Sequence, residues 1–378
     1  MENKYITFSP HKAGLVNVIM SYELAFSIAH ITNRTLVLPP NCFLYGLSNN
    51  HDKNNFIDIL SIFDIDYIKS QIKCIDFYDV SEFQGKYHLL GNQDSYTDGI
   101  SKVIEDVKEI KFKNNTENNV TIIESDTVIT SSDYTDSDFD DFSQSREILN
   151  LSNIKNKFIH FENNLFGHYW YDVYPGNFKK RNLLKKKINT IFKYKKTFDN
   201  LGSIICSKIG IYNATHIRRN DFLDYRKNEI ETISTNLKIL NTLKQYFDTS
   251  IPLYIATDEK DKSFFDLVKT EFKVYFFEDI CKYFDYELSN LEKTVLEQII
   301  CSKSEKFYGT FYSTYSSRIN IMRGIDGKQS DDFMGLNHIG NKIDYSLVNP
   351  WKYKDDRKWG WCDSSHPQWK IEVDGFYV

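Results

Sequence analysis

The feature that most restricts the fold is an alternation of short strand-like and helix-like segments in the second half of the chain. We expect strands at 209–216, 252–257, 273–277 and 306–309, and helices at 231–247, 259–270, 292–301 and 316–323. Strands that alternate with helices form parallel, doubly wound sheets. The second half of the sequence therefore predicts an α/β domain with a parallel sheet.

The first forty residues predict another β-α-β unit. Tyr5–Phe8 and Thr35–Leu38 are short apolar runs, and the segment between them, Leu15–Ile31, is predicted as a helix that is apolar on most of its surface. A helix of that kind is buried on more than one side. Gly14 precedes the helix, where the turn needs either a permissive backbone or room for a ligand to approach closely.

The length of 378 residues predicts two domains, because a single core seldom serves so long a chain. We place the N-terminal domain at 1–195 and the C-terminal domain at 196–330, with a tail at 331–378 that packs back on them. The acidic and polar stretch 112–145 is predicted to be a protruding hairpin or flexible insertion. A lysine-rich amphipathic helix at 179–196 marks the boundary.

The composition excludes several classes of protein. A formal net charge of −5 gives no general attraction to nucleic acid, and no apolar run approaches the roughly 20 residues of a membrane-spanning helix. The N-terminus lacks the apolar core of a signal peptide. The six cysteines are scattered and form no C-x-x-C pair, which favours reduced thiols. We therefore expect a soluble, cytoplasmic protein without a transmembrane segment.

Polar groups suited to phosphate follow three of the predicted strands. The first strand leads into Thr215–Asp221, which contains His216, Arg218 and Arg219; the second ends at Thr257-Asp258, and the third leads through Gly309 to Ser313–Ser316. Parallel strands present ligand-binding residues at their carboxyl ends. Arginine binds phosphate oxygens bidentately, and the first turn of a helix offers free N–H groups to anions. The sequence thus predicts a clamp for a diphosphate.

Several common motifs are absent from the sequence. There is no P-loop, no G-x-G-x-x-G, no G-x-S-x-G and no H-E-x-x-H. The pair Asp64 and Asp66 forms a D-x-D sequence, but it lies far along the chain from the phosphate-binding groups, and we interpret it as incidental. We therefore expect chemistry that needs no metal or other cofactor.

These residues resemble a known family. Thr215–Asp221 resembles the His-x-Arg-Arg-x-Asp/Gly motif of the GDP-fucose O-fucosyltransferase and α1,6-fucosyltransferase superfamily. Tyr254–Asp258 resembles its strand ending in Ala-Thr/Ser-Asp, and Phe307–Arg318 resembles its Gly-x-x-x-Ser-Thr/Ser-Phe-Ser/Thr segment. Gly14–Val18 looks like a degraded Gly-x-Gly-Asn-Gln loop, in which Val16 and Val18 replace glycine and glutamine. The resemblance implies a GT-B fold, with two Rossmann-like domains facing a cleft.

The resemblance also implies roles for individual residues. Arg218 would be the catalytic residue, with His216 also on the diphosphate and Asp258 on the nucleoside. Asn17 would reach donor or acceptor from the other domain. The remaining residues expected to bind substrate are Gly14, Arg219, Asp221, Ser313, Thr314, Tyr315 and Ser316.

The activity implied is inverting transfer of fucose from GDP-β-L-fucose to a hydroxyl of a protein or glycan. Segment 161–171, rich in aromatic and polar residues, is a candidate acceptor wall. Candidate general bases are His11, Glu23, Asp221 and His168. Two alternatives remain: a GT-B transferase for another nucleotide sugar, such as rhamnose or mannose, and a non-catalytic protein that binds a nucleotide sugar.

Overall fold

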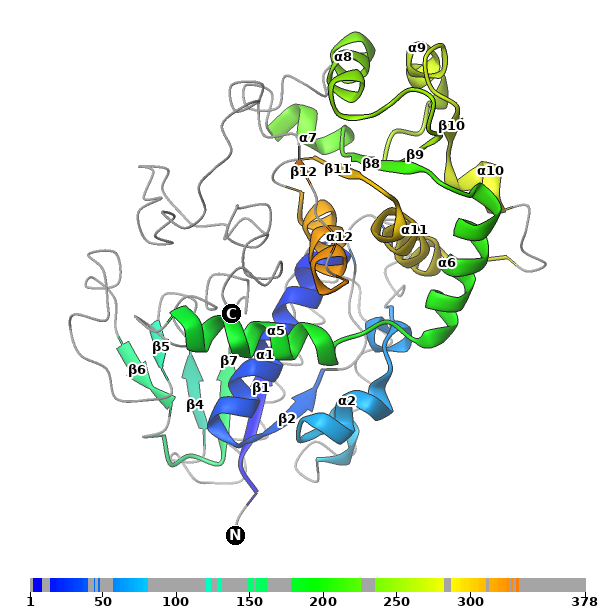
Figure 1. The fold of residues 1–378 in the computed structure, drawn as a ribbon. Coiled ribbons are helices and arrows are strands. Elements are labelled where there is room, and N and C mark those ends of the chain that lie inside the picture. Colours follow the sequence, from blue (N-terminus) through cyan, green and yellow to red (C-terminus); the bar gives the residue numbers. More distant parts are fainter. Residues whose placement is uncertain are drawn as a thin grey trace, which may run out of the picture. The chain divides into compact units, whose positions relative to one another are not determined.

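The computed structural model describes residues 3–8, 14–39, 44, 47, 57–80, 120–123, 128–130, 148–151, 154–161, 178–225, 235–281, 287–310, 313–326, 328 and 331–332 (Figure 1). These residues form two compact units, of which the first ends at Lys193 and the second begins at Tyr194. Each unit is built on its own five-stranded sheet.

The sheet of the first unit is parallel, with the strand order β3-β2-β1-β7-β4. A separate parallel pair joins β5 to β6. The elements of this unit are β1 (Tyr5–Phe8), α1 (Leu15–Thr32), β2 (Thr35–Leu38), the 3-10 turn η1 (Ile59–Ile62), α2 (Ile65–Gln71), β3 (Cys74–Asp76), the 3-10 turn η2 (Phe77–Asp79), β4 (Val120–Ile123), β5 (Val128–Thr130), β6 (Ile148–Asn150), β7 (Phe158–Phe161) and α5 (Phe178–Ile191).

Helix α1 is the core helix of the first unit, as its apolar sequence predicts. It contacts β1 and β2 on one side and α5 on another (Figure 1), and Val18, Ile19 and Ile28 are fully buried. By length and composition alone α1 could cross a membrane, but 78% of that stretch is buried inside the protein. Its apolar surface is accounted for by packing between the sheet and α5.

The stretch 112–145, expected to be an insertion, contributes an edge strand to the first sheet. Strand β4 pairs in parallel with β7 along its whole length, and β5 lies in the separate two-stranded sheet. The acidic residues 131–143 lie outside the described residues, as does the tail beyond residue 332.

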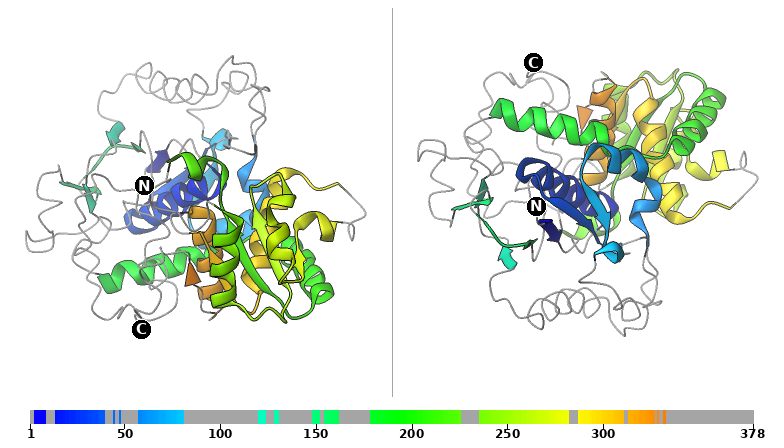
Figure 2. Two further views of the ribbon diagram at one scale, coloured as in Figure 1. Left: turned by 90° about the horizontal axis from the view of Figure 1, so that it is seen from above. Right: turned by 90° about the horizontal axis from the view of Figure 1, so that it is seen from below.

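The second unit has the strand order β10-β9-β8-β11-β12, with every neighbouring pair parallel. Helix α11 contacts β8 and β9 and also packs on α6 and α12 (Figure 2). The elements are α6 (Lys196–Ile209), β8 (Asn213–Ile217), α7 (Asn220–Tyr225), α8 (Asn236–Tyr246), β9 (Leu253–Thr257), the 3-10 turn η8 (Lys262–Phe265), α9 (Asp266–Lys269), β10 (Val274–Tyr275), α10 (Phe277–Cys281), α11 (Asn290–Lys303), β11 (Phe307–Gly309), α12 (Thr314–Ile325) and β12 (Asp331–Asp332).

The predicted strand at 209–216 was placed too early. Ile209 ends helix α6, and Gly210 leaves that helix with a left-handed φ of 84° while its N–H donates to the Cys206 carbonyl at 2.9 Å. The strand itself begins at Asn213. His216 therefore lies inside β8, and Arg218 directly follows its end.

The predicted α/β class is confirmed: each of the two units is built on a parallel, Rossmann-like sheet. In both sheets the first three strands of the chain are added one after another toward the same edge, and the later strands are added on the other side of the first strand. That reversal lies between β1 and β7 in one unit and between β8 and β11 in the other. In open α/β sheets, ligands bind at the carboxyl ends of the strands beside such a reversal.

Candidate functional site

The carboxyl end of β8 brings together the three predicted polar strand ends of the second unit. Within the sheet, His216 pairs with Gly309 of β11 on one side and with Ala256 of β9 on the other. The next residue, Ile217, pairs with Thr257. The residues that follow the three strands therefore meet beside the β8–β11 reversal.

Two threonines brace this end of β8 from both sides. Thr310 Oγ1 donates to the His216 carbonyl at 2.8 Å and accepts from the Arg218 N–H at 2.9 Å. Thr257 Oγ1 donates to the Ile217 carbonyl at 2.7 Å and accepts from the N–H of Glu259 at 3.1 Å. Each hydroxyl thus uses both its donor and its acceptor, and only Thr310 holds the backbone of Arg218.

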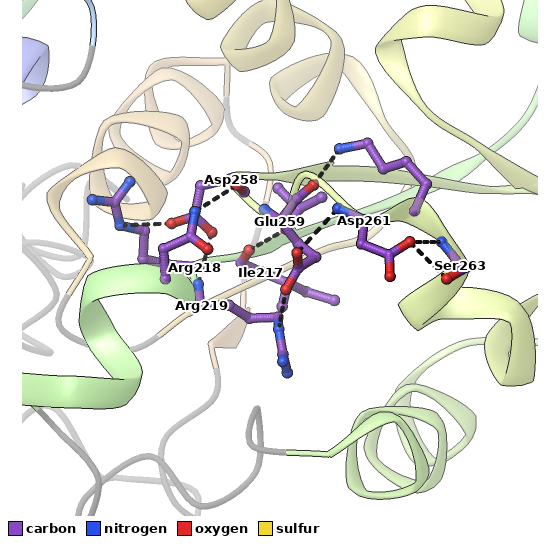
Figure 3. A network of polar contacts seen from close by, with 10 residues as sticks. Ile217, Arg218, Arg219, Asp258, Glu259, Asp261 and Ser263 are labelled. Carbon is purple, nitrogen blue, oxygen red and sulfur yellow. Dashed lines mark hydrogen bonds and ion pairs between the residues drawn. The ribbon is translucent and has the colours of Figure 1, made fainter.

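Arg218 lies beside Asp258 (Figure 3). Its Nε is 3.3 Å from Oδ2 of Asp258, and its side chain keeps 31% of its surface exposed. The other carboxylate oxygen, Oδ1, accepts the N–H of Arg219 at 2.8 Å. The guanidinium also lies near the Phe222 ring of α7, at 5.8 Å. Asp258 therefore fixes the segment that carries Arg218, which remains accessible to a ligand.

Arg219 points to a different set of partners. Its Nε donates to Glu259 Oε2 at 3.0 Å (Figure 3), and its guanidinium carbon lies 3.4 Å from the centre of the Phe264 ring. The residue is only 7% exposed. A paired and stacked guanidinium of this kind ties β8 to the segment after β9. The two arginines of the motif are thus held in different ways.

His216 is a buried imidazole bonded to helix α12. Its Nδ1 lies 2.7 Å from Oγ of Ser316, and its ring centre lies 4.5 Å from that of Tyr315. Burial, together with the positive charge of Arg218, lowers the pKa of His216 to about 3. The imidazole is therefore neutral near pH 7 and contributes no charge to the site.

The contact between β11 and α12 requires glycine at position 309. A Cβ there would lie 2.7 Å from Cβ and 2.8 Å from Oγ of Ser316. Both distances are shorter than real side chains tolerate. Gly309 therefore allows Ser316 to reach His216.

The N-terminus of α12 carries the other predicted anion-binding groups. Ser313 is the N-cap, is buried, and makes no capping hydrogen bond with its side chain among the described residues. Tyr315 donates its hydroxyl to the Thr294 carbonyl at 2.9 Å, so its phenol is engaged with α11. First-turn N–H groups, those of Thr314 and Tyr315 here, have no partner within their own helix. Free N–H groups of this kind are suited to an anion, and the anion site expected at this helix end stays a prediction.

Gly14 and Asn17 belong to the first unit, at the start of α1. Gly14 has φ −66°, and a Cβ there would meet no atom of the described residues within 4 Å. Of the two reasons expected for this glycine, a permissive backbone is therefore not needed, and room for a ligand stays a prediction. Asn17 lies in the first turn, where its Oδ1 is buried without a hydrogen bond among the described residues. Val16 and Val18 are core residues of the helix.

The candidate bases are placed only in part. Glu23 is 1% exposed in the middle of α1. His11, His168 and all but the first residue of the candidate acceptor wall lie outside the described residues; Asp221 is in α7, but its side chain is not described. Asp64, of the D-x-D pair, caps α2 by accepting the Tyr67 N–H at 3.1 Å.

Sequence reasoning missed residues whose only signal is their place at a strand end. Thr310 and Glu259 follow β11 and β9, and both hold the arginine-containing segment.

In the first unit, Thr7 of β1 pairs with His160 of β7 in the sheet, and its Oγ1 lies 2.8 Å from the imidazole Nδ1. Both residues are buried beside the reversal of that sheet.

Comparison with known proteins assigns the family. Two curated relatives named GDP-fucose protein O-fucosyltransferase 2 match part of the chain. The protein of Caenorhabditis elegans is 33% identical over 121 residues, which are 31% of this chain and 27% of that protein. The protein of Plasmodium vivax is 27% identical over 147 residues, 38% of this chain and 29% of that protein. The matches thus span little more than a quarter of these relatives.

A crystal structure of POFUT1 in complex with GDP aligns with a TM-score of 0.48 at 13% identity, over 88% of this chain and 99% of that one. The family model described as GDP-fucose protein O-fucosyltransferase matches residues 5–326, which include the first sheet, strands β8 to β11 of the second sheet and all the groups around β8. The chain therefore belongs to the GDP-fucose protein O-fucosyltransferase family.

Proposed function

We propose that the protein transfers fucose from GDP-β-L-fucose to a hydroxyl group of a protein acceptor, with inversion at the anomeric carbon and without a metal ion. The observation that carries the proposal is the position of Arg218, which follows β8 and whose N–H is held by Thr310, three residues before the N-cap Ser313 of α12, in a chain of this family. A permanent cation and a helix N-terminus together suit a diphosphate.

In this proposal the second unit binds the donor. Arg218 and the first-turn N–H groups of α12 hold the diphosphate, while Ser313 lies at the same helix end. Asp258 is already bonded to the Arg219 N–H, and a carboxylate has lone pairs left for a donor group of the nucleoside. We assign Arg219 to positioning, because its guanidinium is committed to Glu259 and Phe264.

The proposed reaction is a single displacement. The acceptor oxygen forms a bond to C1 of fucose as the bond from C1 to the β-phosphate oxygen breaks, and the electron pair of that bond leaves with GDP. The acceptor proton passes to a base or to the departing phosphate. Negative charge thus develops on the diphosphate, where Arg218 stabilises it, an interaction whose loss typically costs about 10²–10³ in rate.

Metal independence is supported by the kind of charge in the site. The diphosphate is offered a guanidinium and helix N–H groups, and the Asp64 carboxylate of the D-x-D pair is used as a helix cap.

We also propose a cytoplasmic location. Its support is that Cys74, Cys206 and Cys301 are free thiols.

The test has two steps. Calorimetry with GDP, UDP and dTDP is expected to show tight binding of GDP alone; binding of another nucleotide instead would favour a different nucleotide sugar. Hydrolysis and transfer from GDP-fucose are then measured with EDTA and with Mg²⁺. Equal rates support metal independence, and NMR of the first product formed reports whether the anomeric configuration is inverted. GDP binding without any turnover would favour the non-catalytic alternative.

A further inference from the structure

The contact between His216 and Ser316 indicates a role for Ser316, which the sequence alone predicts to bind the phosphate. Ser316 is 1% exposed, and its Oγ faces the imidazole of His216 at 2.7 Å. The absence of a side chain at Gly309 allows this approach. Ser316 therefore acts on the histidine.

The burial of the pair restricts its protonation. His216 is 5% exposed, and it lies two residues from Arg218, whose charge disfavours a second cation. A neutral imidazole has one N–H donor and one acceptor nitrogen. If Nδ1 accepts from Ser316, the proton must be on Nε2; if Nδ1 donates to Ser316, Nε2 can only accept.

The surroundings favour the first arrangement. A diphosphate offers only acceptor oxygens at neutral pH, so a ring nitrogen that contacts it must donate. The register places His216 next to Gly309, at the same strand ends as Arg218 and α12. The Tyr315 ring packs near the imidazole and restricts its rotation.

We propose that Ser316 donates its hydroxyl hydrogen to Nδ1 of His216 and so holds the imidazole as the Nε2–H tautomer, which donates a hydrogen bond to the diphosphate. The histidine then serves the site as a neutral donor, neither as a cation nor as a general base. Ser316 is a positioning residue. The identity of the anion rests on the proposed function, whereas the tautomer does not.

The chain supplies a matched control in the next residue. Ser317 is also 1% exposed on α12, and its Oγ makes no hydrogen bond among the described residues. Ser316→Ala and Ser317→Ala remove the same atom from neighbouring buried positions. Only Ser316→Ala is expected to weaken GDP binding, roughly threefold to tenfold, as befits one neutral hydrogen bond.

A second pair of variants separates the two ring nitrogens. In His216→Gln the amide reaches about as far as Nε2, whereas in His216→Asn it reaches about as far as Nδ1. The proposal expects the glutamine variant to bind GDP within about threefold of wild type, and the asparagine variant to bind roughly tenfold more weakly. The reverse order of affinities would overturn it.

The decisive measurement is the tautomer itself. Protein labelled with ¹⁵N-histidine is observed without ligand from pH 5 to pH 9, and the His216 signals are assigned from their loss in His216→Gln. We expect the Nε2–H tautomer throughout, retained in Ser317→Ala and replaced by a mixture in Ser316→Ala. An Nδ1–H tautomer in wild type, or an unchanged spectrum in Ser316→Ala, overturns the proposal. Failure of wild type to bind GDP would instead refute the proposed function.

Discussion

The two sheets contain the same small motif in different surroundings. In the first unit, the Thr7 hydroxyl lies 2.8 Å from Nδ1 of His160; in the second, the Ser316 hydroxyl lies 2.7 Å from Nδ1 of His216. Both histidines are buried, and both lie on strands next to the reversal of their sheet. The imidazole and its hydroxyl partner therefore do not by themselves distinguish a nucleotide site.

The difference lies in where each unit places its arginine. Arg34 of the first unit is buried and donates to the carbonyls of Ile154, Asn156 and Lys157, just before β7 begins. Arg218 of the second unit follows the carboxyl end of β8 and is partly exposed. An arginine that bonds backbone carbonyls at the start of a strand stabilises the fold. An arginine that is exposed at the carboxyl end of a strand can bind a ligand.

The largest predicted effect is the loss of that exposed cation. Arg218→Ala is expected to lower transfer from GDP-fucose about 10²–10³-fold, while the fold is retained because the Arg219 N–H still binds Asp258. Initial rates and a thermal melt measure the two quantities. Arg218→Lys, which keeps a charge without the planar fork, is expected to restore only part of the rate. Turnover near the wild-type rate in Arg218→Ala would refute the assignment.

The second prediction concerns acid stability. Burial lowers the pKa of His216 in the folded protein to about 3 from its usual 6.5, so between these values only the unfolded state binds the proton. The free energy of unfolding therefore falls as pH falls from 6.5 toward 3, by about 2 kcal/mol at pH 5 from this residue alone. His216→Gln should remove that part of the slope in urea unfolding at pH 5 and pH 7. Equal slopes in both proteins would contradict a buried neutral imidazole.

Glu297 gives the opposite slope within the same unit. Burial raises the pKa of this carboxyl from 4.5 to about 7, although Tyr254 donates its hydroxyl to it at 3.1 Å. The folded state then binds the extra proton, so this contribution to stability is lost as pH rises from 4.5 to 7. Glu297→Gln should raise the melting temperature at pH 8 and leave it nearly unchanged at pH 4.5. A stabilisation that is equal at both values would exclude titration as its cause.

The fourth prediction compares the two histidines directly. His216→Ala is expected to weaken GDP binding about tenfold, the amount typical of one hydrogen bond to a charged group, whereas His160→Ala should leave GDP affinity unchanged. Both variants remove a buried ring, so both should lower stability, and chemical unfolding provides that control. Equal losses of GDP affinity would mean that the sheet of the first unit also contributes to nucleotide binding.

The sequence predicts those parts of the structure that depend on local patterns. Strands β1, β2 and β9 are marked by apolar runs and end where expected, and helix α1 begins at the expected Leu15 and ends one residue past the expected Ile31. The run Ile209–Tyr212 was wrongly predicted to belong to a strand because its apolar composition is typical of one. In the structure it spans the end of α6 and a turn at Gly210, which has a left-handed φ.

The site was predictable in outline because parallel strands gather their carboxyl ends at one edge. The individual contacts were not. Arg218 and Arg219 are adjacent in sequence, yet one lies by Asp258 and the other by Glu259. The bond from Ser316 to His216 depends on the register of β11 against β8, set by residues about a hundred positions apart. Such a register has no local signal.

The smallest expected effect distinguishes a threonine that only stabilises strand β8 from one that also positions Arg218. Thr310→Val and Thr257→Val each remove one hydroxyl that donates to a β8 carbonyl, so each should cost about 1–2 kcal/mol of stability. Of the two threonines, only Thr310 also accepts the Arg218 N–H, so only Thr310→Val should slow transfer. The expected slowing is roughly threefold to fivefold, which corresponds to losing part of the free energy of one hydrogen bond. Thr310→Ser, which keeps the hydroxyl, should restore the rate. If both valine variants lower kcat equally, the threonines only brace β8, and Arg218 does not depend on Thr310 for its position.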